Sequence, residues 1–404
     1  MAIFKYTAVD YVGRKVHGRI KAKDRASVVS TLRKGQLYII SIVEIDEKKA
    51  WLFAQKRMVR PEELMVFSRQ LSALVKAGIP LVKSLNTLFN QVENRHFKEI
   101  ISTIFTDIEA GKSLSDALSS HPETFPPLYI NLIRAGEVSG ALEVILERLS
   151  SYLEGATKLN RKVKSAFIYP AVVLAFAFLI TALILLKVIP SFKNIYDQMG
   201  ARLPIPTQVA IKFSDWTKQY FLVFLVATPL LFFLFKFLMH QPAFRLKWDK
   251  FKLNMPVFGL LLRKVIIARF ARTLATLLRS GVPIFSALDT ASKTSGNRVV
   301  EMTLEQVRMQ VSKGEKIADS LTQSNVFPPL VVNLIAVGEE TGELPGMLER
   351  VALFYEDEVD SSVSGLTSLI EPFIIIFLGV VIGGIVLAMF LPILQLTRLV
   401  GGAR

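Results

Sequence analysis

Two short motifs contain residue types that suit phosphate or cation binding. The first, Ala110-Gly-Lys-Ser113, ends like the phosphate-binding P-loop. A P-loop also needs a glycine five positions before Gly111 and a strand leading into the loop. That position is Thr106, no strand pattern precedes it, and the matching segment of the second half reads Lys313-Gly-Glu-Lys316. The motif therefore predicts a turn between two helices, with Ser113 as the N-cap of the second helix.

The second motif, Gly136-Glu-Val-Ser-Gly140, recurs as Gly338-Glu-Glu-Thr-Gly342. Its glycines and hydroxyl residues fit a turn in which Gly136 ends one helix and Ser139 or Thr341 caps the next. Such a turn does not explain the glutamates. They either hold the turn through backbone donors or face a partner or a cation. The candidate signature residues of the motif are Gly136, Glu137, Gly140, Gly338, Glu339 and Gly342.

Other catalytic or metal-binding chemistry has little support. The chain contains no cysteine, which excludes disulfides, thiolate metal sites and cysteine nucleophiles. No histidine pair has metal-binding spacing, and no Ser-His-Asp set is present. The histidines are His17, His96, His121 and His240. We therefore expect no catalytic residue, no metal ligand set and no cofactor.

One acidic residue lies at the edge of an apolar segment. Glu371 precedes Pro372 near the start of the last such segment, and its counterpart in the first half is Tyr169. Ionisable groups inside a membrane tend to be functional. A position at the membrane interface explains both residues equally well, so both interpretations of Glu371 stay open.

The composition predicts a membrane protein with large soluble parts. Hydrophobic residues make up 51% of the chain and charged residues still make up 21%. Crossing a hydrocarbon core of about 30 Å takes about 20 apolar residues. Three segments qualify: Phe167–Ile189, Phe221–Met239 and Leu369–Leu394.

The distribution of basic residues predicts the orientation. The net charge is +15, but the basic residues gather beside the apolar segments rather than in a patch typical of nucleic-acid binding. The flanks before the first segment and after the second are basic, so the positive-inside rule places them in the cytoplasm. Segment 190–218 and the tail 395–404 are then periplasmic. No signal-peptide pattern opens the chain, and we expect a cytoplasmic N-terminus.

An internal repeat organises the chain. Phe67–Pro80 returns as Phe270–Pro283, and Phe125-Pro-Pro-Leu returns as Phe327-Pro-Pro-Leu. Each copy has the helical periodicity of a bundle of about six helices. The Phe-Pro-Pro segments are expected to anchor a phenylalanine in the core and set the direction of the fifth helix; partner binding is the alternative. The last helix of each bundle has no obvious break before the membrane, although Ser361–Gly365 is weakly helical and fits a hinge.

The predicted fold is mainly α, an integral membrane protein with two repeated cytoplasmic helical bundles, three transmembrane helices and a small N-terminal α+β module. The expected divisions are an α+β module at 1–45, a linker at 46–60, repeat 1 at 61–166, transmembrane helices at 167–189, 219–239 and 369–394, a periplasmic loop at 190–218, a cytoplasmic connector at 240–264, repeat 2 at 265–368 and a periplasmic tail at 395–404.

These duplicated motifs resemble the inner-membrane platform proteins of type II secretion and type IV pilus machines. The resemblance extends to Tyr6-x-Ala8-x-Asp10-x-x-Gly13, Gly200–Thr207 and Met255-Pro-Val-Phe-Gly259, and so covers nearly the whole chain. It implies a non-enzymatic scaffold that helps a cytoplasmic ATPase lift pilin or pseudopilin subunits into a filament. The implied partners are that ATPase, the subunits, other inner-membrane components and further copies of the chain. Nucleic acid is not among them.

Two other classes of protein fit the sequence less well than this family. A secondary transporter is often built from internal repeats, but it needs broken helices and polar groups at mid-membrane, of which these segments offer little. An ATP-hydrolysing membrane enzyme needs the P-loop that Thr106 disfavours.

Overall fold

The computed structural model describes residues 2–9, 15–22, 25–34, 38–45, 58–191, 205–324 and 326–401. The chain divides into two compact units, of which one comprises 1–60 with 91–102 and the other comprises 61–90 with 103–404. The expected linker at 46–60 lies outside the described residues except for 58–60, and the part 192–204 of the expected loop at 190–218 lies outside them too. Asp10, Gly13 and Gly200 of the resemblance are also outside the described residues.

The N-terminal module is a three-stranded antiparallel sheet with one helix. Strands β1 (Ala2–Val9), β2 (Lys15–Ala22) and β3 (Tyr38–Ile45) are ordered β2-β1-β3, and α1 (Arg25–Lys34) lies between the last two in sequence. Both pairings are antiparallel, with a register shift between Thr7 and Ala8 against β3. The predicted α+β module is confirmed.

Repeat 1 begins where the sequence predicts it. Proline at the first position and two glutamates in the first turn favour the start of α3, and Gly78 adopts the left-handed conformation (φ 77°) after its end. The helices of repeat 1 are α3 (Pro61–Lys76), α4 (Leu81–Gln91), α5 (Arg95–Glu109), α6 (Leu114–Ser119), α7 (Pro127–Ser139) and α8 (Leu142–Leu183).

The Phe-Pro-Pro segment anchors repeat 1 to its core. Phe125 is fully buried, and its ring meets Tyr129 edge-on with 5.0 Å between centroids. Pro126 is the N-cap of α7 and Pro127 its first residue. In repeat 2, Phe327 is 6% exposed and packs on Phe270 with 5.1 Å between centroids. The predicted anchoring role of the phenylalanines is confirmed.

Repeat 2 has the same order of helices, preceded by an additional one. Its first helix starts at Phe258, earlier than the position that matches Pro61, after a tight turn at Val257 (φ 66°, ψ −58°). The helices of this half are α11 (Pro242–Asn254), α12 (Phe258–Arg279), α13 (Ile284–Thr294), α14 (Arg298–Ser312), α15 (Ile317–Thr322), α16 (Pro329–Thr341) and α17 (Leu344–Gly401).

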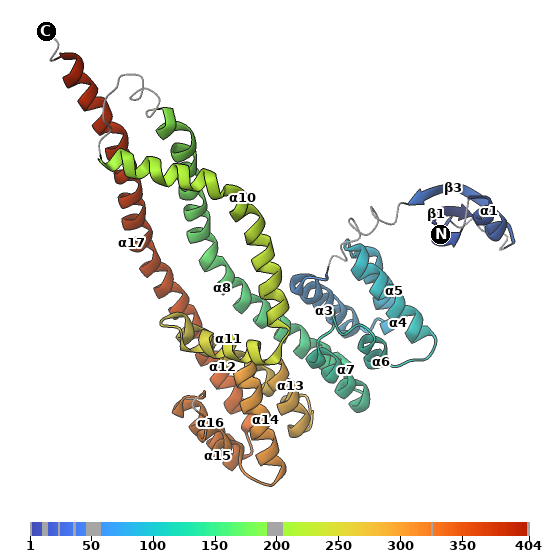
Figure 1. Cartoon of the computed structure of the whole chain (residues 1–404). Helices are drawn as coiled ribbons and strands as arrows, with labels where there is room; N and C mark the ends of the chain where they lie inside the picture. The colour runs from blue at the N-terminus through green and yellow to red at the C-terminus, as the bar shows by residue number, and fades with distance from the viewer. Residues whose placement is uncertain are drawn as a thin grey trace. The chain divides into compact units, whose positions relative to one another are not determined.

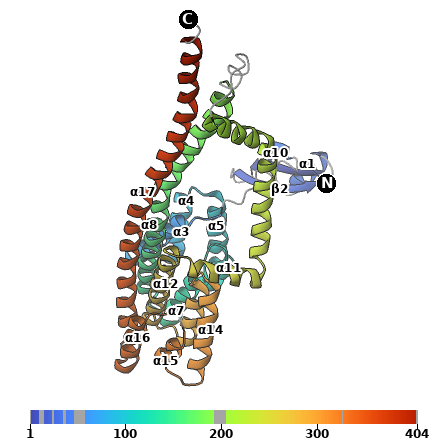
Figure 2. The ribbon, with the colours of Figure 1, turned by 60° about the vertical axis from the view of Figure 1, so that its left-hand side comes forward.

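The last helix of each repeat runs unbroken out of its bundle. Helix α8 has 42 residues, with Pro170 inside it, and continues into a π-helical turn at Ile184–Val188. Helix α17 has 58 residues and stays helical through Ser361–Gly365, the weakly helical segment in which the sequence allowed a break. The helices lie side by side (Figure 1), with Phe178 and Phe377 6.2 Å apart between centroids. Figure 2 shows them from another direction.

Among the described residues, two helices are long and apolar enough to cross a membrane. They are Leu142–Ser191, which contains the first predicted segment, and Leu344–Ala388, which contains the third from Leu369 to Ala388. A third crossing is obtained if Val226–Met239 and Pro242–Asn254, bent by 103° against each other, count as one span. The second predicted segment belongs to α10 (Ile205–Met239), which begins inside the segment expected to be a periplasmic loop.

Candidate functional site

Each Gly-Glu motif forms the last turn of a helix that ends at the second glycine of the motif rather than at the first, which corrects the sequence interpretation. Gly136 is a buried residue of α7, and the helix ends at Gly140 in the left-handed conformation (φ 70°). Ser139 does not cap α8, because its Oγ donates to the carbonyl of Ala135 one turn earlier. Gly342 ends α16 in the same way (φ 74°). Thr341 likewise bonds back to Val337.

Gly136 and Gly338 are needed because another helix passes close to them. A Cβ atom on Gly136 would lie 3.0 Å from the Cβ of Ile145 in α8. A Cβ atom on Gly338 would lie 2.9 Å from the backbone Cα of Leu344 in α17. The glycines therefore set how closely the fifth helix of each repeat packs against the long helix.

Glu137 and Glu339 cap a helix elsewhere in their own repeat. The Glu137 carboxylate accepts hydrogen bonds from the backbone N–H groups of Leu114 (2.5 Å) and Ser115 (3.2 Å) at the start of α6. Glu339 accepts from Ile317 (2.7 Å) and Ala318 (2.9 Å) at the start of α15. Carboxylates satisfy the free donors and the positive end of a helix. This geometry favours the structural interpretation of both glutamates over binding of a partner or cation.

The P-loop-like segment forms the predicted turn. Gly111 is left-handed (φ 91°), and Ser113 caps α6 by accepting from the backbone N–H of Asp116. Lys112 pairs with Asp107 at 2.9 Å. Within the described part of the chain, no group of three or more His, Asp or Glu side chains is placed to hold a metal ion.

Two ion pairs link the first helix of each repeat to its long helix at matching positions. Arg69 meets Glu154 at 3.4 Å in repeat 1, and Arg272 binds Glu356 through two nitrogens, at 2.9 and 2.8 Å, in repeat 2. The second pair joins Lys76 to Glu147 at 2.8 Å, and the hydrogen bond with Glu147 raises the pKa of Lys76. Its match in repeat 2 joins Arg279 to Glu349.

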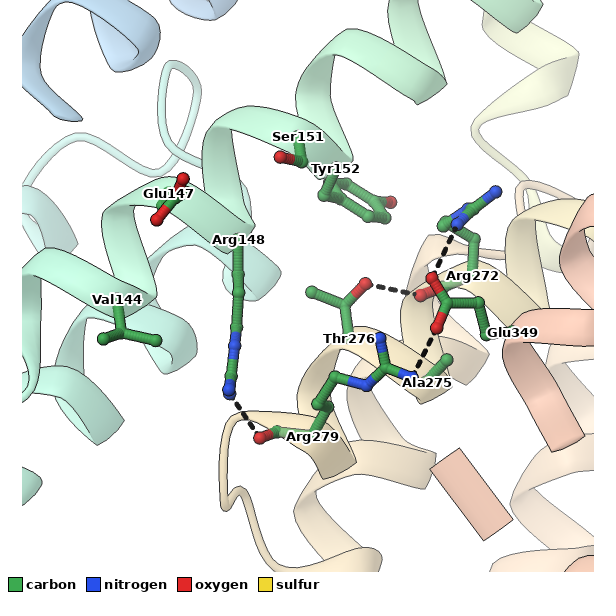
Figure 3. A pocket seen from close by; sticks show the side chains of 10 residues that line it. All are labelled: Val144, Glu147, Arg148, Ser151, Tyr152, Arg272, Ala275, Thr276, Arg279 and Glu349. Carbon is green, nitrogen blue, oxygen red and sulfur yellow. Dashed lines mark hydrogen bonds and ion pairs between the residues drawn. The ribbon is translucent and has the colours of Figure 1, made fainter. Parts of the chain in front are cut away.

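The two repeats meet along a cleft of about 450 Å³ between α8 and the pair α12 and α17 (Figure 3). From α8, Arg148 reaches the end of α12 and donates to the carbonyl of Arg279. The buried hydroxyl groups of Tyr152 and Thr273 lie 3.1 Å apart, and burial raises the pKa of Tyr152. The cleft thus joins side chains of repeat 1 to the ion-paired face of repeat 2.

The polar side chains of the cleft make contacts within repeat 2 and across the interface between the repeats. The arginines of the cleft already have partners: Arg272 and Arg279 both bind Glu349, and Arg148 binds a carbonyl. A further contact between repeats joins the Asn131 amide to Thr290 Oγ1 at 2.9 Å. These groups hold two bundles together through polar contacts.

The remaining sequence candidate lies elsewhere. Glu371 is on the exposed surface of α17, away from the cleft residues, and so is Tyr169 on α8. Sequence reasoning missed Asp249 in the connector. Its buried carboxylate accepts from the backbone N–H of Arg298 at 2.9 Å, at the start of α14. The basic residues that flank Asp249 in the sequence do not indicate that its side chain is buried against the start of another helix.

The fold and the interface define a class of membrane-anchored scaffold built from two copies of one helical bundle. A family model described as type II secretion system protein F matches residues 67–190 and again residues 270–392. A model of the N-terminal domain of the same family matches residues 1–43. The chain belongs to the type II secretion system protein F family, the platform proteins of type II secretion and type IV pilus systems.

Curated relatives cover nearly the whole chain. It is 41% identical to the type IV pilus assembly protein PilC of Myxococcus xanthus, over 98% of this chain and 95% of the relative. It is 42% identical to PilC of Thermus thermophilus, over 98% of both chains. Identity to the type II secretion system protein F of Vibrio cholerae is 33%, over 99% of both.

Proposed function

We propose that this protein is a non-enzymatic inner-membrane platform that couples a cytoplasmic ATPase to the polymerisation of pilin or pseudopilin subunits. The observation that carries the proposal is the continuity of α8 and α17 from bundle to membrane segment. At 1.5 Å per residue, their 42 and 58 residues extend about 60 and about 85 Å. Each bundle can therefore pass a rotation or displacement directly to the membrane.

In this proposal both bundles and the N-terminus face the cytoplasm, and three helices cross the membrane. The ATPase docks on the cytoplasmic bundles, while the subunits and other inner-membrane components meet the membrane helices. The platform itself acts as a homo-oligomer. A pilus system is the first candidate because the two pilus assembly proteins are 41% and 42% identical to the chain, against 33% for the secretion protein.

Deletion of the gene tests the proposal. We expect loss of surface pili and twitching, or loss of protein secretion if the system is a secretion system. Affinity purification of the tagged full-length protein is expected to recover an ATPase. Normal pili, motility and secretion in the deletion strain, with no ATPase recovered, would contradict the proposal.

A proline substitution tests the transmission of movement. Ser165 lies in α8 just before the membrane segment, and among the described residues its Oγ donates only to the carbonyl of Lys162 in the same helix. Ser165→Pro removes a backbone hydrogen bond in addition to the one already lost at Pro170, and it kinks or breaks the helix. Ser165→Ala keeps that hydrogen bond. We expect S165P to lose pili while still binding the ATPase, and S165A to behave like wild type. Full piliation of S165P would exclude a rigid connection.

A further inference from the structure

The two repeats use one surface in different ways. In repeat 2 the outer face of α12 is covered by α8, and Thr273 is completely buried. In repeat 1 the matching face of α3 is open, and Gln70, which matches Thr273, is exposed. The ion pairs show the same difference: the Arg272 side chain is 21% exposed and that of Arg69 is 71% exposed. We call this open face of α3, with Arg69 and Gln70, the acceptor surface of repeat 1. No described part of the chain covers it as α8 covers α12.

Repeat 2 carries the complementary surface. At the cleft, α8 reaches α12 of repeat 2 through Arg148 and Tyr152, and their matches on α17 are Arg350 and Phe354. Farther along α8, Asn160 and Lys162 also contact repeat 2, at Arg269 and Asp360. Both matches are exposed, Phe354 to 46%. Within the described residues, the Arg350 side chain makes no hydrogen bond or ion pair. Beside it, Leu353 is 51% exposed.

A second contact between the repeats has a match that keeps both residue types. Asn131 of α7 donates to Thr290 of α13 across the interface. The matching residues are Asn333 of α16 and Thr87 of α4, and both are exposed. Thr87 bonds only to the carbonyl of Lys83 in its own helix, among the contacts described. Helices α16 and α17 of repeat 2 therefore present side chains that match those of the interface within the chain. The residues that match their partners lie on repeat 1.

We propose that these surfaces join one copy of the chain to the next, with repeat 2 of one copy seated on repeat 1 of another as repeat 1 is seated on repeat 2 within the chain. Asn333 then donates to Thr87 of the second copy. Arg350 donates to the carbonyl of Lys76 at the end of α3, where a cation meets the negative end of the helix. Phe354 covers Gln70. This inference gives a surface to the proposed homo-oligomer and does not depend on the ATPase.

The charges on the two surfaces are compatible. On the acceptor surface, Arg69 pairs with Glu154 and Lys76 pairs with Glu147. The surface of repeat 2 that receives Arg148 has positive and negative charges at the matching positions. Partly exposed arginine and aromatic side chains such as Arg350 and Phe354 are typical anchors of protein interfaces. Because the two surfaces differ, the contact is heterologous, and it forms a ring when the rotation between copies closes.

Disulfide formation between two tagged full-length copies tests the arrangement, and the absence of native cysteine makes the experiment clean. One copy carries Asn333→Cys and the other Thr87→Cys, co-expressed in membranes and oxidised. Docking holds the two thiols at a high effective concentration, so we expect at least about tenfold more linked product than for the control pair. The control pairs N333C with Val82→Cys, which lies on another face of α4.

Three further arms settle the interpretation. A single chain carrying Asn131→Cys and Thr290→Cys is expected to form the disulfide within one copy, which shows that this contact can be linked. Arg350→Glu in the N333C copy is expected to reduce the linked product several-fold. Linking of N333C to N333C, or equal linking of N333C to T87C and V82C, would overturn the proposal. A mass measurement that shows only monomers of the protein in a native-lipid membrane mimic would also overturn it.

Discussion

Repeat 1 and repeat 2 share a framework but differ in what covers it. Both have a glutamate that caps a six-residue helix, a glycine at the crossing of the fifth and long helices, and two ion pairs between the first and long helices. In repeat 2 the Arg272–Glu356 pair of this framework is half-buried, while the matching Arg69–Glu154 pair of repeat 1 is exposed. The features that both repeats share therefore stabilise each bundle, and the difference in exposure indicates which surfaces of the bundles join.

The cores also differ in one coordinated place. In repeat 1, Ser68 Oγ donates to Tyr129 OH at 3.1 Å, and both residues are buried. The matching residues of repeat 2 are Ala271 and Val331. A hydrogen-bonded pair in one copy corresponds to an apolar pair in the other, because leaving only one buried polar partner would cost more than keeping or removing both.

The largest effect is expected from the capping glutamates. Glu137→Ala and Glu339→Ala each leave two helix-start donors without their carboxylate, and we expect each to destabilise the protein by about 3 kcal/mol. The check is thermal unfolding of the purified full-length protein in detergent, with Glu→Gln as the matched control that keeps one acceptor oxygen. Glu→Gln is expected to cost less than Glu→Ala. Unchanged stability with lost piliation would instead support a partner-binding role.

The ion pairs between the first and long helices are expected to contribute differently to stability in the two repeats. Arg272→Ala removes a half-buried pair bound through two nitrogens, at a cost of about 2 kcal/mol. Arg69→Ala removes an exposed pair and is expected to cost less than about 1 kcal/mol. Thermal unfolding of both variants, at low and high salt, makes the comparison. Equal losses would show that burial does not distinguish the two repeats.

The crossing glycine of repeat 2 is expected to be intolerant of a methyl group. Gly338→Ala places a Cβ 2.9 Å from a backbone atom of α17, and we expect a loss of about 1 to 2 kcal/mol. Gly155→Ala is the control, because no atom lies within 4 Å of its Cβ position and alanine favours the helix. We expect G155A to melt no lower than wild type. A G338A variant as stable as G155A would contradict the close crossing.

The smallest effect concerns pH and repeat 1 alone. Burial raises the pKa of Tyr129 to about 12, from 10.0. A raised pKa contributes stability that is complete below pH 10 and is lost as the pH rises towards 12, because the unfolded state ionises first. Between pH 9 and 11 this contribution falls by about 1 kcal/mol. Tyr129→Phe is expected to unfold with a shallower dependence on pH than wild type over that range; an identical dependence would exclude Tyr129 as its source.

The parts of the structure that the sequence predicted are those set by local residues. Ser113 caps its helix, Gly78 ends α3, and Phe125 is buried, as the local patterns indicate. The start of α10 was missed because segment 190–218 was assigned only as the connection between two apolar segments, although Ile205, Val209 and Phe213 already follow a helical spacing.

The parts that were missed depend on tertiary contacts. A glycine at position 136 is typical of a helix end, yet here it allows close approach of Ile145. No local sequence pattern distinguishes a glycine that ends a helix from one that permits close packing. The partner of Glu137 is a helix start more than twenty residues earlier in the chain. The uncovered face of α3 depends on where α8 packs, because Gln70 is exposed and the matching Thr273 is buried although they lie in the same motif.

Thiol labelling of Gln70→Cys and Thr273→Cys tests the central comparison most directly, since these residues occupy matching positions. Full-length single-cysteine variants are labelled with a maleimide in native membranes and after dissociation into monomers. The account predicts that T273C is labelled slowly in both states, and that Q70C is labelled slowly in membranes but rapidly in monomers. Equal, rapid labelling of Q70C in both states would show that no second copy covers repeat 1, and would contradict the account.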